Sequence, residues 1–171
     1  MRLGLISDTH GFIPPVIHTV FAGVDAICHA GDISGDRGDV EELLAELSSI
    51  GPVRAVSGNV DGFELSGVPR WSEIETPCGK LGITHRALEG GRLVSGVDQE
   101  CRQRQLSILV YGHTHSPAFF DNAGVYWVNP GSAGQASHGW PLSAAVLTCL
   151  EMVLVPTVTF FDLETGAKLR I

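Results

Sequence analysis

The sequence predicts a single α/β domain whose first half alternates strands with helices and whose second half is rich in strands. The first observation is the strand–helix alternation over residues 2–57, which is typical of a parallel sheet with short crossover connections. The second is the length of 171 residues, close to that of one ordinary domain. The third is the lack of a linker or an internal repeat in the sequence. We therefore expect one domain over residues 1–171.

The first half of the chain supplies the elements of the parallel sheet. Residues 2–7 predict a first strand, and residues 15–22 predict a short helix that begins at a pair of prolines. Residues 25–29 predict a second strand. Residues 39–49 place their apolar side chains on one helical face behind a capping aspartate, which predicts a longer helix. A Gly-Pro pair ends this helix, and a third strand is expected at residues 53–57.

The second half of the chain predicts mostly strands. A Pro-Cys-Gly turn indicates a hairpin, and a modest helix is expected over residues 95–105. Turns that contain Asn-Ala-Gly, Asn-Pro-Gly and Glu-Thr-Gly separate several of the later strands. The expected strands are residues 71–76, 79–84, 107–111, 117–121, 124–128, 143–150, 153–161 and 167–171.

Composition and charge narrow the class of protein. With 44% hydrophobic residues the chain can bury a substantial core. No apolar run approaches the roughly 20 residues needed to span a bilayer, and the N-terminus does not read as a secretory signal. We therefore expect a cytoplasmic protein without a membrane partner. The formal net charge of −8 argues against long nucleic acids as partners, because a general binder neutralises phosphates with basic residues.

The four cysteines predict structural thiols. Cys28, Cys78, Cys101 and Cys149 are widely spaced and form no CxxC pair, so neither a disulfide framework nor a zinc ribbon is indicated. Cys28 and Cys149 lie in apolar runs, where a buried thiol behaves as a small hydrophobic group.

Short polar motifs occur where the predicted hydrophobic strands end. Ligand sites of open α/β sheets assemble at strand ends, so we expect these motifs to converge. Carboxylate, imidazole and amide oxygen groups bind divalent transition metals, and this mixture favours Mn, Fe, Ni, Zn or Co over Ca. Seven such groups are too many for one tetrahedral ion and suit two ions that share a carboxylate. The candidate ligands are Asp8, His10, Asp32, Asn59, His85, His113 and His115.

The spacing of the motifs strengthens this interpretation. In Asp8-x-His10 and in His113-x-His115 the two side chains are two residues apart, so they project to the same side of an extended backbone. Taken alone, each residue has an ordinary explanation. A single aspartate or asparagine more often occupies a turn, and a single histidine more often packs or lies on the surface. The joint occurrence at successive strand ends favours the metal site.

The ordered set D-x-H, GD, GN, H and GHTH resembles the calcineurin-like metallophosphoesterase superfamily. The resemblance extends from Asp8 to about Ser132. The small size and the Asn129-Pro130-Gly131-Ser132 run are similar to the compact YfcE-type phosphodiesterase branch, which also includes the retromer scaffold subunit. The resemblance implies a metallo-dependent phosphatase-like, four-layer α/β/β/α sandwich, in which two sheets pack face to face with helices outside.

The resemblance also implies how two divalent ions are held. Asp32 is expected to be shared by both ions, and Mn is the expected metal ahead of Ni, Fe, Zn or Co. Asp32, Asn59 and His85 are the expected catalytic positions. One ion is expected to bind Asp8, His10, Asp32 and His115, and the other Asp32, Asn59, His85 and His113.

The implied activity is hydrolysis of small phosphate esters, above all diesters, by a hydroxide that bridges the two ions. Many members of the superfamily have a histidine where this chain has Val60, which cannot donate a proton. We therefore expect a preference for good leaving groups such as aryl esters. Arg86 is a candidate phosphate contact because a guanidinium suits that geometry, although a solvated surface arginine is an equal alternative. His138, on a predicted loop, is a second candidate substrate contact or a plain loop residue.

Two other functions stay open. The first is a non-catalytic scaffold of the same fold, as in the retromer subunit, although every ligand position here carries a competent residue. The second is a nucleotide-specific enzyme, for which a cyclic nucleotide would fit. His29 is expected either to orient a ligand or to pack against its strand. The sequence leaves open whether the chain forms a homo-oligomer.

Overall fold

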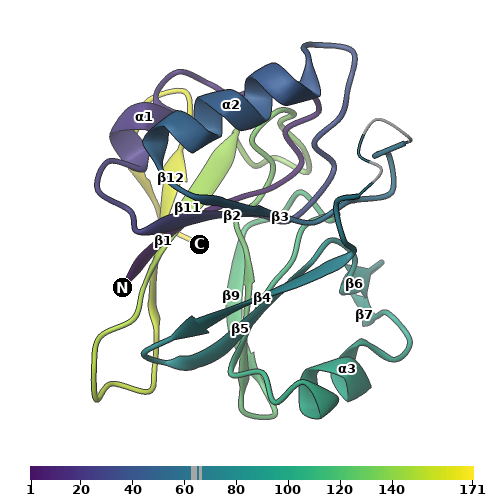
Figure 1. Ribbon diagram of the computed structural model, residues 1–171, viewed down its shortest axis with the longest axis vertical. Helices are drawn as coiled ribbons and strands as arrows, with labels where there is room; N and C mark the ends of the chain where they lie inside the picture. Colours follow the sequence, from purple (N-terminus) through teal and green to yellow (C-terminus); the bar gives the residue numbers. More distant parts are fainter. Residues whose placement is uncertain (63–64, 66) are drawn as a thin grey trace.

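Two β-sheets form the centre of the molecule (Figure 1). The computed structural model describes residues 1–62, 65 and 67–171. The first sheet has six strands and is mixed, because its three strands from the first half pair in parallel and those from the C-terminal part pair antiparallel. In spatial order its strands are β13 (Lys168–Leu169), β12 (Thr157–Asp162), β11 (Ser143–Thr148), β1 (Arg2–Ile6), β2 (Ala26–His29) and β3 (Val53–Ala55).

The second sheet has five strands and is also mixed. Its three inner strands pair in parallel, and each edge strand pairs antiparallel with its neighbour. In spatial order its strands are β4 (Trp71–Thr76), β5 (Gly79–Thr84), β8 (Ile108–Val110), β10 (Val125–Asn129) and β9 (Ala118–Asn122). A small separate hairpin, β6 (Leu88–Glu89) and β7 (Arg92–Leu93), follows β5 in the chain.

Helices form the outer layers. Helices α1 (Ile17–Val20) and α2 (Val40–Ile50) lie over the six-stranded sheet, and α3 (Val97–Gln103) lies on the far side of the five-stranded sheet (Figure 1). Helix α2 begins at Asp39, whose carboxylate accepts a hydrogen bond from the backbone N–H of Glu41 at 2.7 Å. Such a cap satisfies a backbone donor that the helix cannot, and it fixes where α2 starts.

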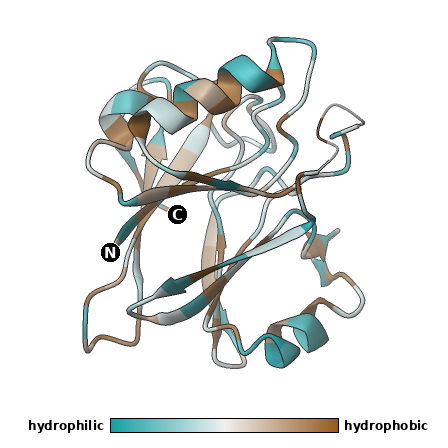
Figure 2. Ribbon diagram, viewed as in Figure 1, coloured by the Kyte–Doolittle hydropathy of each residue, from teal (hydrophilic) through white to brown (hydrophobic). Residues whose placement is uncertain are grey.

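Three hydrophobic cores hold the layers together. One lies between the two sheets and includes Leu5 and Val110, and a second joins the six-stranded sheet to α1 and α2 through residues such as Leu47. A third, with Cys101 and Trp127, lies between the five-stranded sheet and α3. Figure 2 shows that α3 is largely hydrophilic away from this contact. These cores confirm the predicted four-layer α/β/β/α sandwich. None of the described helices is both long and apolar enough to cross a membrane.

The predicted elements are present with changed ends. The helix expected over residues 15–22 is shorter, because residues 14–18 form tight turns in which the N–H of Ile17 donates to the carbonyl of Pro14. The strand expected over 153–161 begins only at Thr157, because the preceding residues form an exposed loop. The hairpin of β6 and β7 is absent from the prediction. All four cysteines are buried and free, as predicted.

Candidate metal centre

The seven candidate ligands all follow the carboxyl ends of strands. In the six-stranded sheet these are β1, β2 and β3, and in the five-stranded sheet they are β5 and β8. Because the strands concerned run parallel within each sheet, their carboxyl ends lie at one edge, where the two sheets bring their loops together. The six-stranded sheet supplies Asp8, His10, Asp32 and Asn59, and the five-stranded sheet supplies His85, His113 and His115.

Left-handed backbone conformations occur repeatedly among these ligands. A positive φ is uncommon for residues other than glycine and costs on the order of 1 kcal/mol or more, so it persists only where the surrounding structure enforces it. Its clustering in three ligand loops indicates that the loops are shaped for the site. The φ values are 54° at Asp8, 46° at His10, 53° at Asp32, 69° at His113 and 54° at His115.

A first group of ligands consists of Asp8, His10 and His115. Their ligand atoms lie within 4.8 Å of one another. Nε2 of His115 is 3.2 Å from Oδ1 of Asp8, and the His10 and His115 rings are 5.5 Å apart. Nε2 of His10 is buried and has no hydrogen-bond partner among the described residues. A buried polar atom without a partner is costly, so this nitrogen fits a metal ligand.

A second group consists of Asp8, Asp32 and His85, again within 4.8 Å. Nε2 of His85 lies 3.2 Å from Oδ2 of Asp32 and 3.0 Å from Oδ1 of Asn59. Nδ1 of the same ring is 2.7 Å from the carbonyl oxygen of Ala30. This contact places the proton of a neutral ring on Nδ1 and leaves the Nε2 lone pair free for a metal.

His113 completes the second group. Its ring lies 5.3 Å from that of His85, and its backbone N–H donates to Oδ2 of Asp8 at 3.2 Å. All seven predicted ligands therefore lie together at one centre. Asp8 belongs to both groups in this geometry, whereas the assignment of Asp32 as the shared ligand stays a prediction.

The electrostatics of the centre favour positive charge between its carboxylates. Burial alone lowers the pKa of His85, but the hydrogen bond to Asp32 and the charges of Asp8 and Asp32 raise it overall. The hydrogen bond to Asp8 likewise raises the pKa of His115. Burial, followed by the charge of His85, lowers the pKa of His113. A divalent cation can take the place of the protons that this cluster would otherwise hold.

The turn after β10 holds two of the ligand loops in place. Nδ2 of Asn129 donates to the carbonyl oxygen of Gly112 at 2.9 Å and to Oγ1 of Thr114 at 3.0 Å. Oγ of Ser132 donates to the backbone oxygen of Asp8 at 3.0 Å. Both side chains are buried. This role is not among the sequence-based predictions, although a polar Asn-Pro-Gly-Ser run directly after a buried strand is a signal for it.

Asp61 joins the loops that follow β2 and β3. Its Oδ1 accepts the N–H groups of Ile33 and Ser34, each at 2.8 Å, and its Oδ2 accepts that of Gly58 at 2.7 Å. These bonds join the loop that carries Asp32 to the loop that carries Gly58, and they fix the backbone next to Asp32. Asp61 therefore supports the ligand loops and does not act as a ligand.

His29 orders the loops after β1 and β2 from beneath the centre. Its Nδ1 accepts the N–H of Gly31 at 3.2 Å, so in the neutral ring Nε2 carries the proton and donates to Oγ1 of Thr9 at 3.0 Å. The hydroxyl of Thr9 in turn donates to the carbonyl oxygen of Ile33. Burial lowers the pKa of His29 to about 4, which keeps the ring neutral. The orienting role expected for His29 agrees with these contacts.

Two hollows adjoin the centre. One, of about 490 Å³, is lined by Asn59, His85 and Arg86, and the other, of about 520 Å³, is lined by His10 and Val60. Arg86, a predicted substrate contact, thus lies beside the ligands, where Glu89 binds its guanidinium.

His138, the other predicted substrate contact, lies on an exposed loop. Its Nδ1 is 2.7 Å from Oγ of Ser137, and it lines neither of the two hollows beside the centre. Its role in substrate binding stays a prediction.

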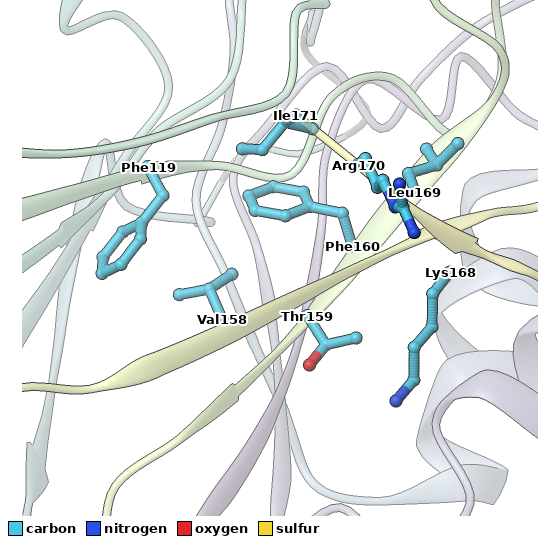
Figure 3. Close-up of a pocket in the computed structure, with 8 residues that line it drawn as sticks. All are labelled: Phe119, Val158, Thr159, Phe160, Lys168, Leu169, Arg170 and Ile171. Atoms are coloured by element: carbon cyan, nitrogen blue, oxygen red, sulfur yellow. The ribbon is translucent and has the colours of Figure 1, made fainter.

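A larger hollow, of about 640 Å³, lies elsewhere, between β9 and the pair β12 and β13 (Figure 3). Phe119, Val158 and Phe160 contribute to its apolar lining, and it contains none of the predicted ligands. The chemistry of the centre, rather than the size of a cavity, therefore identifies the functional site.

Comparison with known proteins agrees with the geometry. A model of the calcineurin-like phosphoesterase superfamily domain matches residues 1–152. The chain belongs to this superfamily. The chain is 32% identical over 141 residues to a probable metallophosphoesterase of Methanothermobacter thermautotrophicus, with 77% of each chain covered. It is 28% identical over 168 residues to phosphodiesterase YfcE of Escherichia coli, which covers 86% of this chain and 87% of that protein.

Solved structures of the superfamily share the fold. The structure of YfcE, a phosphoesterase from Escherichia coli, matches with a TM-score of 0.71 and 25% identity, covering 99% of this chain and 97% of that one. Vps29 of Entamoeba histolytica in complex with Zn²⁺ matches with a TM-score of 0.77 and 24% identity, covering 98% and 96%. The resemblance inferred from the motifs is confirmed.

Proposed function

We propose that this chain is a cytoplasmic phosphodiesterase that hydrolyses small phosphate esters with the help of two divalent cations. The observation that carries the proposal is the convergence of seven intact ligands. One of their atoms, Nε2 of His10, is buried without a hydrogen-bond partner among the described residues. Membership of the superfamily and the relative named phosphodiesterase support hydrolysis as the reaction class.

The cations and the residues that hold them have different roles in the proposed reaction. When bound, a pair of divalent cations would lower the pKa of a coordinated water toward neutrality and balance charge on the phosphoryl oxygens. Asp8, Asp32, Asn59 and the four histidines of the centre would hold these cations, of which Mn²⁺ is the expected one. Nδ1 of His85, bound to the carbonyl of Ala30, fixes the ring so that its Nε2 points at Asn59 and Asp32. The protein thus sets the geometry before substrate arrives.

The space around the centre favours a diester over a monoester. One hollow opens beside Asn59 and His85, and the other opens beside His10 and Val60. A phosphodiester carries two organic substituents, and each hollow can accept one of them. A monoester carries only one organic substituent, so one of the two hollows would stay empty.

A scaffold function is the second candidate. The loop between β11 and β12 exposes apolar side chains, among them Leu150, Met152 and Leu154. The fold is also shared with Vps29. A protein that served only as a scaffold would have no need for a complete ligand set, so we place this function second.

The decisive experiment combines metal content with turnover. The protein, purified without added metal, is expected to contain or to take up two cations and to hydrolyse bis-p-nitrophenyl phosphate with Mn²⁺ or Ni²⁺. Asp32→Ala and His113→Ala are expected to lose at least about 1,000-fold in kcat/KM, because each removes a ligand that stabilises the transition state. The far-UV circular dichroism spectrum is expected to stay unchanged.

His18→Ala is the matched control, since His18 is exposed on α1 and pairs with Glu46 away from the centre. Turnover that survives in either ligand variant would overturn the proposed centre. Metal counts in Asp8→Ala and Asp32→Ala identify the shared ligand, whose removal is expected to release both cations. Loss of both from Asp8→Ala but of one from Asp32→Ala would transfer that role to Asp8.

A further inference from the structure

One of the two hollows beside the metal centre has a composition that the proposed reaction does not require. The hollow of about 490 Å³ begins at Asn59 and His85 and is also lined by Arg70, Trp71 and Arg86. An adjoining hollow of about 310 Å³ shares Trp71 and Arg86 and extends to α3. Together they form a groove that leads from the ligands across Trp71.

The pairing of β4 with β5 places Trp71 beside the ligands. Trp71 is the first residue of β4 and lies opposite Thr84, the residue that precedes His85. Oγ1 of Thr84 also donates to the carbonyl oxygen of Arg70 at 3.3 Å. Register in an antiparallel pair fixes which side chains are neighbours. The tryptophan is therefore held near the candidate ligand His85 by the sheet itself and not by a loop.

Charged neighbours hold the indole in a fixed orientation. Cζ of Arg104 lies 5.1 Å from the centroid of the Trp71 ring, a cation–π contact. Glu73 and Glu100 bind the Arg104 guanidinium at 2.7 and 2.8 Å. Trp71 is only half-buried and lines the groove, so part of its surface is available to a ligand. A rigid aromatic group loses little entropy when it binds a flat partner.

Guanidinium groups line the groove, although the whole chain carries a net charge of −8. Arg70 and Arg86 both line it. Two carboxylates partly offset their charge. Glu89 binds the Arg86 guanidinium at 2.6 Å, and Asp61 also lines the groove, where it accepts three backbone N–H groups. Guanidinium groups bind phosphate oxygens and sugar hydroxyls. A ligand in this groove would thus meet an aromatic face and the guanidinium groups of Arg70 and Arg86.

We propose that this groove binds the nucleoside portion of a phosphodiester, with its base stacked on Trp71 and its sugar or a further phosphate bound by Arg70 and Arg86. This inference rests on the proposed function, since the scissile phosphate must lie at the metals. Every nucleobase offers a flat face for stacking, so the groove selects nucleosides as a class and does not select one base. The preferred substrates are small nucleotide diesters.

The test compares two diesters with the same leaving group. Thymidine 5′-(p-nitrophenyl phosphate) and methyl p-nitrophenyl phosphate both release p-nitrophenolate, so they differ only in the substituent that stays on phosphorus. Trp71→Leu is expected to lower kcat/KM for the thymidine ester by about 10- to 100-fold, the worth of one base–aromatic stacking contact. The methyl ester is expected to be unaffected, and Trp71→Phe is expected to restore most of the loss.

Phe120→Leu is the matched control, because Phe120 is an aromatic residue on β9, at the opposite edge of the same sheet. Equal losses for both esters in Trp71→Leu would overturn the proposal and leave the phosphodiesterase assignment intact. Failure of the unchanged protein to hydrolyse either ester would instead overturn the assignment. If thermal melting shows that Trp71→Leu does not fold, the two esters are compared in Arg70→Gln instead, since Arg70 is exposed. A selective loss for the thymidine ester supports the groove, and no selectivity overturns it.

Discussion

Nδ2 of Asn129 lies 2.9 Å from the carbonyl oxygen of Gly112, so the turn after β10 holds the start of the loop that carries His113 and His115. The same amide reaches Thr114 within that loop at 3.0 Å. Asn129 is fully buried, and its Oδ1 accepts the N–H of Gly131 at 2.8 Å. These contacts position the loop that carries two of the candidate ligands.

Replacement of this amide tests that placement. Asn129→Ala is expected to weaken metal binding by about 10- to 100-fold, the effect typical of removing a residue that orients metal ligands. It is also expected to lower the free energy of unfolding by about 1–3 kcal/mol, because buried partners lose their hydrogen bonds. Competition with a fluorescent chelator measures the affinity, and urea titration measures the stability.

Ser143→Ala is the matched control for this variant. Oγ of Ser143 donates to the carbonyl oxygen of Pro130 at 2.9 Å in the same buried turn, but it touches no ligand loop. We expect a similar loss of stability and an unchanged metal affinity. An equal loss of affinity in both variants would show that the turn acts only through overall stability.

Gly58 lies against Asp32 so closely that only glycine fits. A Cβ atom at this position would overlap the carboxylate and the backbone nitrogen of Asp32. Gly58→Ala is therefore expected to displace Asp32, to lower the bound metal below two equivalents and to abolish turnover. Gly62→Ala is the control, because a Cβ there meets no atom of the described residues within 4 Å. Full metal content in Gly58→Ala, measured by inductively coupled plasma mass spectrometry, would contradict this geometry.

His29 makes the stability of the metal-free protein depend on pH. Burial lowers the pKa of His29 from 6.5 to about 4 in the folded state, so the unfolded chain binds more protons between these values. The free energy of unfolding therefore rises with pH across this window and falls on acidification. Between pH 7 and pH 5 this group accounts for a loss of about 2 kcal/mol.

A comparison with His29→Asn isolates that effect. The asparagine can still accept the N–H of Gly31 but does not titrate, and the other titrating groups are shared by both proteins. The difference in the free energy of unfolding between the two proteins is expected to shrink by about 2 kcal/mol from pH 7 to pH 5. A constant difference in urea titrations with EDTA would show that His29 is not neutral when folded.

Val60 leaves the proposed reaction without a side-chain proton donor at that position. Its backbone N–H binds Oδ1 of Asp32 at 3.0 Å, and its side chain is exposed beside the hollow that contains His10. We expect the rate to depend steeply on the pKa of the leaving group, with aryl esters far ahead of alkyl esters. A Brønsted plot for substituted phenyl esters measures this slope, and a flat plot with chemistry rate-limiting would contradict it.

The centre could be predicted from the sequence because its ligands lie directly after strands. The parallel pairing of β1, β2 and β3 brings Asp8, Asp32 and Asn59 to one edge, and hydrophobic runs followed by polar residues mark such edges. The layers were likewise predictable from the change from strand–helix alternation to consecutive strands.

The residues that support the site could not be predicted from the sequence, because their contacts join segments that no local pattern connects. Ser132 binds Asp8 across 124 residues, and Trp71 lies beside His85 only through the register of β4 with β5. Hydrophobicity misleads at residues 150–155, where an apolar run predicts an early start of the strand but the structure exposes Leu154. Pattern alone cannot distinguish a buried apolar run from an exposed one.

The ligands are distributed along the chain from Asp8 to His115, and this spread determines when the site can form during synthesis. A nascent chain cannot bring all seven candidate ligands together until the loop after β8 has left the ribosome. Strand β1 also lacks its antiparallel neighbour until β11, which ends at Thr148, has been synthesised. Assembly of the candidate metal centre is thus a late event in the maturation of this protein, and it follows the emergence of most of the polypeptide.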